Sequence, residues 1–453
     1  RAEPSELPAT AGHPTGGTGL PDRDEVGIGF EARRADPVPV AHENRRAIME
    51  RRSQRWILDT LLGVGGIGVL HPESQGAFEQ MGYDHADLVR VYSQAKAGAM
   101  LPKAWTTTAQ QVERRAQYAE ERGYKITARD LYQRAAQLYG RAQYGFFRDD
   151  PRKTALHAKM VDCSRKVMAA MPNPVERVEI PFEGKTIYCV LHLPAEAKTK
   201  RVPVVLLLPG MDMFKEDWHP MAQRHLVPRG LAGMAIDGPG QGETLLHGVK
   251  VTVDNYERAA KAVLDYLVKR PEIDPASLVL LGVSMGSYWG TRLAAFDDRI
   301  KGAATVMGCY ALDNMDVIFN VAQPSFKLNF MYMAGISDEA EFDEKVTKQM
   351  GLRNSAPEVK CPLLMCIGEF DELLPLEEAL AVYDLVRAPK EIWVYEQEFH
   401  PLGNVSGELF SSLFDWLLGA LASKYQPGMD NRIVLGRDGS HVKGSGRPAW
   451  WLA

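Results

Sequence analysis

Apolar residues recur at intervals of three and four positions along the first part of the chain, after a start that is rich in Pro, Gly and Ala. That spacing places the apolar side chains on one face of a helix. Thr127 and Asp150 stand where N-caps are expected. The pattern predicts an irregular arm over residues 1–38 and an all-helical domain over 39–173. The expected helices are 43–62, 84–101, 107–123, 127–147 and 150–171.

The period changes after Pro172-Asn173-Pro174, where short apolar runs begin to alternate with helical segments. Such alternation predicts a mainly parallel sheet with helices on both faces. The expected strands are a hairpin, 177–182 with 185–193, followed by 202–208, 231–237, 277–282, 302–308, 362–368 and 391–395. A hairpin followed by six strands is typical of an α/β-hydrolase core with an eight-stranded sheet.

We therefore expect a catalytic domain over residues 174–424. Its longest connection, 309–359, should lie over the carboxyl edge of the sheet, near the active site. The remaining segment, 425–453, is Gly-rich and carries Trp450 and Trp451 near its end. It is treated as a C-terminal tail without an assigned structure.

The segment Gly282-Val283-Ser284-Met285-Gly286 follows an expected strand and precedes an expected helix. A nucleophile elbow needs this strand, tight turn and helix, with small flanking residues around a strained serine. The Gly-x-Ser-x-Gly pattern alone is weak, but its context makes Ser284 the candidate nucleophile.

A serine nucleophile needs a base and an acid, which follow it in the chain order Ser, Asp or Glu, His. The loop after strand 362–368 offers Asp371 as the preferred acid. The loop after strand 391–395 offers His400 as the base. The competing acids are Glu369 and Glu372, and the competing histidine is His441 in the tail.

An oxyanion hole needs two backbone N–H groups directed at the developing negative charge. Met285, directly after the nucleophile, supplies one candidate. Met211, in the loop after strand 202–208, supplies the other. The methionine side chains are no obstacle, because the backbone donates.

Other patterns point away from cofactors and metals. Residues 63–68 match GxGxxG, but a helical segment precedes them where a dinucleotide site needs a strand. Residues 237–243, DGPGQGE, lack the Lys-Ser/Thr ending of a phosphate loop and are interpreted as a turn. No cluster has metal-ligand spacing, and we expect neither a cofactor nor a metal ion.

Composition excludes several classes of partner. The net charge is −5 without a long basic block, which argues against nucleic acid and anionic membranes. The apolar run 57–70 is too short and too interrupted to span a membrane. The five cysteines lack paired spacing and are expected to be reduced and buried. No signal peptide is visible, so a cytoplasmic location is expected, although a chain that begins at Arg1 could have lost a leader.

Several motifs together resemble one known family, over residues 41–424. They are PGMDMFKED (209–217), IDGPGQGET (236–244), GVSMG (282–286), GEFDELLP (368–375) and EFHPLGN (398–404). These resemble the α/β-hydrolases that include dihydroxypseudooxynicotine hydrolase and the fungal yellowish-green polyketide-shortening hydrolases. The resemblance implies an N-terminal helical cap over the active site, a triad of Ser284, Asp371 and His400, and a homodimer.

Some members of that family cleave a carbon–carbon bond beside a ketone, and others are esterases or acyl hydrolases. The nicotine-pathway member uses an extra glutamate after the sixth strand, where this chain offers only Asp313 and Asp316 as possible auxiliary acids. The favoured alternative for either aspartate is a helix N-cap or a surface carboxylate. The expected function is therefore hydrolysis of an ester, amide or ketone carbon–carbon bond in a small aromatic or polyketide-like substrate, through an acyl-enzyme. The alternative is a non-catalytic helical scaffold that carries a degenerate hydrolase domain.

Overall fold

The computed structural model describes residues 59–64, 71–322 and 324–452. The expected arm, 1–38, most of the expected helix 43–62 and most of the GxGxxG segment lie outside the described residues. All described residues belong to one compact unit.

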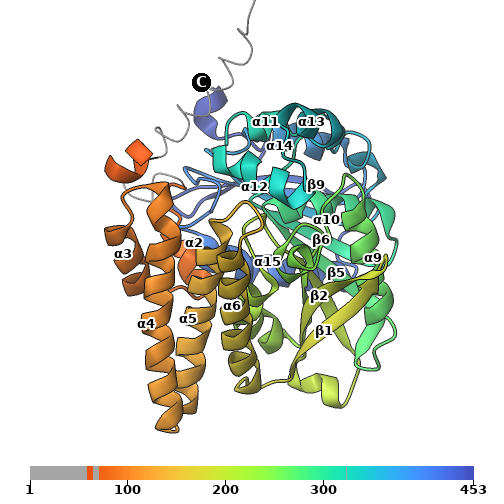
Figure 1. Cartoon of the computed structure of the whole chain (residues 1–453). Coiled ribbons are helices and arrows are strands. Elements are labelled where there is room, and N and C mark those ends of the chain that lie inside the picture. Colours follow the sequence, from red (N-terminus) through yellow and green to blue (C-terminus); the bar gives the residue numbers. More distant parts are fainter. Residues whose placement is uncertain (1–58, 65–70, 323, 453) are drawn as a thin grey trace, which may run out of the picture. The chain divides into compact units, whose positions relative to one another are not determined.

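Helices occupy the described chain from residue 75 to 169, ahead of the sheet (Figure 1). Their small and aromatic side chains form a separate hydrophobic cluster, which includes Trp105, Tyr132 and Tyr139. Helix α4 packs along α5, and α5 along α6. This group is referred to below as the cap. Its helices are α2 (Gln75–Gln80), α3 (His85–Gln94), α4 (Leu101–Glu121), α5 (Lys125–Tyr144) and α6 (Pro151–Ala169).

One sheet of ten strands follows, in the order β1-β2-β4-β3-β5-β6-β7-β8-β9-β10. The pairs β1–β2, β2–β4 and β9–β10 are antiparallel, and all the others are parallel. The strands are β1 (Val175–Phe182), β2 (Lys185–His192), β3 (Val202–Leu208), β4 (Ala232–Asp237), β5 (Ile273–Val283), β6 (Ile300–Val306), β7 (Leu363–Gly368), β8 (Lys390–Tyr395), β9 (Asp430–Leu435) and β10 (His441–Lys443).

The two faces of the sheet bury alternate residues of its central strands, because successive side chains of a strand point to opposite sides. On β3, Val204 and Leu206 join one hydrophobic cluster, and Val205 and Leu207 join the other. Helices α9 (Asn255–Leu267), α10 (Met285–Phe296) and α14 (Leu376–Leu385) cover the first face. Helix α15 (Ser406–Leu421) covers the second. This confirms an α/β-hydrolase fold with an N-terminal helical cap.

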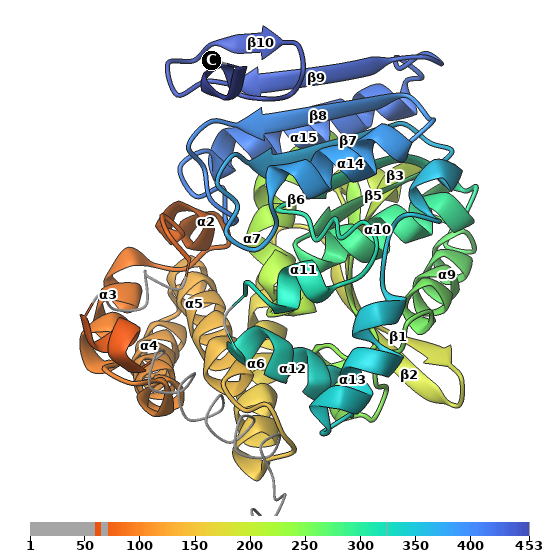
Figure 2. The same cartoon turned by 90° about the horizontal axis from the view of Figure 1, so that it is seen from above.

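The connection between β6 and β7 forms a group of helices that lies beside the cap in Figure 2. They are α11 (Asp316–Phe319), α12 (Pro324–Ala334) and α13 (Glu339–Lys345). Two shorter helices, α7 (His219–Met221) and α8 (Gly242–Leu246), follow β3 and β4.

Two expectations about boundaries were wrong. The sheet has ten strands, not eight, because the segment treated as a tail forms β9 and β10 and β9 pairs with β8. Thr127 lies inside α5, which begins at Lys125, directly after a turn in which Gly123 has a φ of 73°. Asp150 does cap α6, since its side chain accepts a hydrogen bond from the Arg152 N–H.

Among the described residues, no helix is long and apolar enough to cross a membrane.

Candidate active site

Ser284 occupies a sharp turn between β5 and α10. Its φ of 52° and ψ of −120° lie in a region that costs a non-glycine residue strain. A side chain at Gly282 would come within 2.3 Å of the Gly286 carbonyl oxygen, and one at Gly286 within 2.1 Å of the Leu208 carbonyl oxygen. Both flanking glycines are therefore required for the turn to pack against β3.

Three side chains from separate loops form one hydrogen-bonded chain. The Ser284 Oγ lies 3.0 Å from His400 Nε2. On the other side of the ring, His400 Nδ1 lies 2.9 Å from Asp371 Oδ2. Asp371 is itself fixed by the backbone N–H groups of Leu373 and Leu374, at 2.9 and 3.0 Å. This arrangement fits a serine whose proton can pass to an oriented imidazole.

The competing residues have other partners. Glu369 accepts hydrogen bonds from the Gln397 N–H and from the Trp450 indole. Glu372 accepts from the backbone N–H of His400 at 2.8 Å and contacts His71 Nδ1 at 2.9 Å. His441 lies on β10, opposite Leu435. Of these carboxylates, only Asp371 contacts the His400 ring.

The charges around His400 favour its protonated form. Burial alone would lower the pKa of His400, but the carboxylates of Asp371, Glu372 and Asp212 outweigh it, so the pKa lies above its usual value of 6.5. The imidazolium that forms when the serine loses its proton is therefore stabilised.

The loop after β3 runs beside the serine. A side chain at Gly210 would come within 3.2 Å of Ser284 Cβ. Met211 lines the same cavity as Ser284. Met285 is the first residue of α10, whose leading N–H groups have no partner within the helix. The structure thus brings the Met211 and Met285 backbones close to Ser284.

The side chain of Gln241 holds this loop from behind. Its Nε2 donates to the Gly210 carbonyl at 2.8 Å, and its Oε1 accepts from the Tyr256 hydroxyl at 2.8 Å. The Tyr256 ring stacks on Trp289, with ring centroids 3.9 Å apart. Gln241 is 2% exposed. Because Gly210 C=O and Met211 N–H belong to one planar peptide, this contact fixes the direction of the Met211 N–H.

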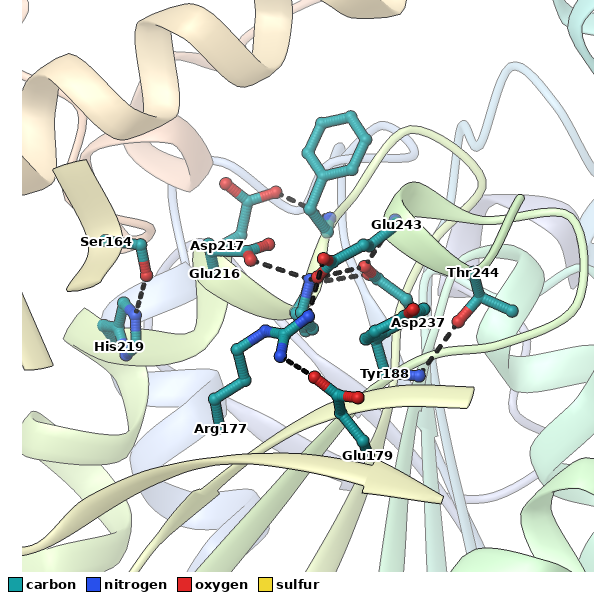
Figure 3. A network of polar contacts seen from close by, with 12 residues as sticks. Ser164, Arg177, Glu179, Tyr188, Glu216, Asp217, His219, Asp237, Glu243 and Thr244 are labelled. Atoms are coloured by element: carbon teal, nitrogen blue, oxygen red, sulfur yellow. Dashed lines mark hydrogen bonds and ion pairs between the residues drawn. The ribbon is translucent and has the colours of Figure 1, made fainter. Parts of the chain in front are cut away.

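The far end of the loop is held by a buried ion cluster around Lys215. Its Nζ lies 2.8 Å from Glu216, and 2.9 Å from Asp237 and from Glu243. Figure 3 shows these three carboxylates converging, with Arg177 reaching Glu243 from β1. Burial alone would lower the pKa of Lys215, but the surrounding carboxylates raise it strongly, so the ammonium stays charged. Residues 237–243, interpreted from the sequence as a turn, therefore hold both ends of the loop after β3. Gln241 holds Gly210 at one end, and Asp237 and Glu243 hold Lys215 at the other.

A cavity of about 600 Å³ lies in front of Ser284 and His400. The cap, the loop after β3 and helix α12 all contribute to its wall, so the cap covers the serine. A cavity of this size and apolar character suits a small organic molecule. Its aromatic lining comprises Phe78, Tyr92, Trp105, Tyr144, Phe147, Phe326 and Phe410.

One ion pair stands in this largely apolar wall, whose other polar side chains include Asp59, His71, Ser74 and Ser325. Arg141, from α5, donates to the carboxylate of Asp212 and, through Nε, to the Tyr83 hydroxyl at 3.0 Å. Burial would raise the pKa of Asp212, but Arg141 lowers it overall, so the carboxylate is ionised. Sequence reasoning missed this pair. No local pattern marked it, because Arg134 and Gln137 stand on the same face of α5.

The structure does not bring Asp313 or Asp316 to the cavity. Asp313 is exposed at the surface in an ion pair with Arg353. Asp316 begins the short helix α11 and does not line the cavity. This geometry gives no support to either residue as an auxiliary acid, and the surface position of Asp313 fits the alternative that it is a surface carboxylate.

A second contact between a serine and a histidine lies elsewhere, between the cap and the sheet. Ser164 Oγ lies 2.8 Å from His219 Nε2 (Figure 3). The other ring nitrogen of His219 contacts His192, not a carboxylate. Neither Ser164 nor His219 lines the cavity. This pair has no acid and no access to a substrate.

All five cysteines are free and buried. Among the described residues, no group of three or more His, Cys, Asp or Glu side chains is arranged to hold a metal ion.

Comparison with known proteins agrees with this geometry. A family model described as "Esterase FrsA-like" matches residues 80–346. The 2,6-dihydropseudooxynicotine hydrolase of Paenarthrobacter nicotinovorans is 27% identical over 320 residues, which cover 70% of this chain and 84% of that protein. The α/β hydrolase xenA of Xenoacremonium sinensis is 30% identical over 234 residues, covering 50% of this chain and 55% of that protein.

Solved structures show the same fold. The crystal structure of the 2,6-dihydroxy-pseudo-oxynicotine hydrolase matches with a TM-score of 0.68 and 24% identity, over 78% of this chain and 98% of that one. AbyA5 matches with a TM-score of 0.60 and 18% identity, over 76% and 95%. None of these likenesses supports a non-catalytic scaffold. The family model covers more than half of the chain, which therefore belongs to the FrsA-like esterase family and is a serine hydrolase.

Proposed function

We propose that Ser284, His400 and Asp371 are the catalytic triad of an acyl hydrolase. The observation that carries this proposal is their continuous hydrogen-bonded chain, which meets the cavity at its serine end. A strained serine, an oriented histidine and a buried acid are the three parts that such a nucleophile needs.

In the proposed reaction, the Ser284 oxygen attacks the substrate carbonyl as His400 Nε2 takes its proton. The backbone N–H groups of Met211 and Met285 hold the resulting oxyanion. His400 then returns the proton to the leaving group, which leaves an acyl-enzyme. A water molecule, activated by the same histidine, releases the acid. Asp371 keeps the imidazole in the required orientation throughout.

We propose a small aromatic or polyketide-like substrate, with the residues over 39–173 acting as the cap and 309–359 as a second wall. The aromatic lining of the cavity supports this choice, because flat rings pack well against it. The bacterial relative is named for a small organic substrate, 2,6-dihydropseudooxynicotine.

The bond that breaks is an ester or amide bond, or the bond beside a ketone. An ester or amide needs only the triad and the oxyanion donors. A carbon leaving group must be delocalised by a neighbouring carbonyl or ring, and an acid beside it would help. Because Asp313 and Asp316 lie away from the cavity, any help for a carbon leaving group must come from other residues.

The test compares the two serines that contact a histidine. Ser284→Ala should abolish hydrolysis of a p-nitrophenyl ester and labelling by a fluorophosphonate probe. Ser164→Ala, the matched control, should keep both, although it leaves a buried histidine nitrogen unpaired and costs about 1–3 kcal/mol of stability. Labelling that survives Ser284→Ala, or that disappears in Ser164→Ala with the fold intact, would contradict the assignment.

A cytoplasmic location and a homodimer remain proposals. The first rests on the composition of the chain and the second on the family resemblance. Light scattering on the purified protein tests the dimer, and cell fractionation tests the location.

A further inference from the structure

The cap wall of the cavity carries three polar groups in apolar surroundings. Arg141 and Tyr144 lie three residues apart on α5, on the same side of the helix. Tyr92 comes from α3. All three line the cavity that contains Ser284. Tyr92 is linked to Arg141 through Trp105, since Tyr83, which accepts a hydrogen bond from Arg141, and Tyr92 both pack edge-on against that ring.

Each of these groups has hydrogen-bonding capacity that the protein leaves unused. Arg141 donates through Nε and Nη1 to Tyr83 and Asp212, and its Nη2 has no partner among the described residues. The hydroxyls of Tyr144 and Tyr92 likewise have no partner there. None of the three atoms is sealed off by protein. Because the three residues line the cavity, these groups are available to a substrate bound there.

The tyrosines act as donors. Burial raises the pKa of Tyr92 to about 12, and burial together with Asp212 raises that of Tyr144 further. Both hydroxyls therefore keep their protons at neutral pH. A guanidinium and two phenols present N–H and O–H groups to an acceptor, and the chemical partner that matches them is an oxygen.

The charge balance decides which kind of oxygen. Asp212 already pairs with Arg141, and it is ionised. A substrate carboxylate would add a second negative charge to a cation that is already neutralised, in a largely apolar cavity. Such an unpaired buried charge is strongly disfavoured. A neutral carbonyl or phenol oxygen accepts the same hydrogen bonds without that cost.

We propose that Arg141, Tyr144 and Tyr92 form a subsite for a neutral carbonyl or phenol oxygen of the substrate, apart from the acyl carbonyl that Ser284 attacks. The inference rests on the proposed function for the location of the reacting carbonyl. Such a subsite favours an oxygenated aromatic or polyketone substrate. It disfavours acids, which add a charge, and plain hydrocarbons, which lack the oxygen.

The test measures binding, so that it does not depend on turnover. The Ser284→Ala protein is titrated calorimetrically with benzoylacetone, which has two ketones, with butyrophenone, which has one, and with benzoylpropionic acid. We expect benzoylacetone to bind about 10-fold more tightly than butyrophenone, as one additional hydrogen bond to a cationic donor predicts. The acid should bind most weakly.

Tyr144→Phe in the same background should reduce the preference for benzoylacetone over butyrophenone about 3- to 10-fold. Its hydroxyl has no protein partner, so the fold should be unaffected. Arg141→Lys should reduce the preference as well. Tyr118→Phe, on the exposed side of α4, is the matched control and should leave it unchanged.

Equal affinities for the two ketones, tightest binding of the acid, no binding of any probe, or an unchanged preference in Tyr144→Phe would each overturn the subsite. The esterase activity of the parent protein is measured separately. A failure of the triad therefore shows as activity that survives Ser284→Ala, whatever the binding data show.

Discussion

Replacing Gln241 should slow catalysis without weakening substrate binding. The Gln241 amide is oriented without ambiguity, because Nε2 faces the carbonyl oxygens of Gly210 and Pro209, which can only accept. The Tyr256 hydroxyl, which donates to Oε1, completes the arrangement. Gln241→Leu keeps the approximate volume of the side chain and removes both hydrogen bonds. The Gly210–Met211 peptide then loses its side-chain anchor, and its carbonyl keeps the hydrogen bond from the Met213 N–H at 3.2 Å, so its orientation is held less firmly.

The size of the effect follows from the contacts that remain. Loss of a whole oxyanion donor typically costs about 100- to 1,000-fold in kcat. In this protein the far end of the loop stays anchored, because the Lys215 N–H and Nζ still bond to Asp237. We therefore expect kcat to fall about 10- to 100-fold in Gln241→Leu, with little change in KM. Tyr256→Phe keeps the amide but frees its orientation, and should cost about 3- to 10-fold.

The assay is steady-state hydrolysis of a p-nitrophenyl ester, combined with inhibition by an aryl trifluoromethyl ketone. The inhibitor forms a tetrahedral oxyanion on the serine, so its affinity should weaken in parallel with kcat. Gln133→Leu is the matched control. Gln133 is buried on α5 and its amide atoms have no partner among the described residues, so this change should leave the kinetics unaltered. Unchanged kcat in Gln241→Leu, or a loss confined to KM, would refute the reasoning.

Two further predictions concern charge. Neutral His400 is the active base, so activity should rise with pH through the elevated pKa of His400. Glu372→Gln removes one of the negative charges that raise this pKa, so the acid limb of kcat/KM should move to lower pH. The exposed Glu344→Gln should leave the acid limb in place. A limb that stays or moves upward in Glu372→Gln would contradict the electrostatic account. Lys215→Met removes the cation that three buried carboxylates share, and only Glu243 keeps another, Arg177. The free energy of unfolding, measured by urea denaturation, should fall by about 3–5 kcal/mol, whereas the exposed Lys360→Met should change it little.

The triad residues could be proposed from the sequence because each depends on local features and chain order. Ser284 is marked by two glycines whose absent side chains the turn requires. Asp371 and His400 directly follow apolar runs that form β7 and β8. Parallel neighbouring strands bring the loops at their carboxyl ends together. Knowledge of the strand order was therefore enough to place these three side chains near one another.

The direction of a long connection could not be predicted in this way. Asp313 and Asp316 belong to the connection after β6, which ends at Val306, but the path of the chain after a strand depends on distant partners. Arg353, forty residues later, pairs with Asp313 at the surface. The same limit explains the missed strands β9 and β10. Residues 430–435, which end in a short apolar run within an otherwise Gly-rich segment, form a strand because β8 offers a free edge, and no local pattern records that edge.

The segment 237–243 shows how a correct local interpretation can still miss a function. It was expected to be a turn, and a turn does follow β4 at residues 238–241, although Gly242 and Glu243 already begin α8. Its polar residues looked like ordinary turn residues, since a turn requires only local hydrogen bonds. Gln241 and Glu243 instead point away from the turn, to Gly210 and Lys215 in a loop about 30 residues earlier. Because β3 and β4 are adjacent in the sheet, the two loops meet only after the sheet has formed. The order of the strands in the sheet therefore brings together the side chains that hold the loop beside Ser284, whereas short sequence motifs mark the reacting residues. Variants of the loop-holding residues, such as Gln241, should alter the rate while leaving Ser284, His400 and Asp371 in contact.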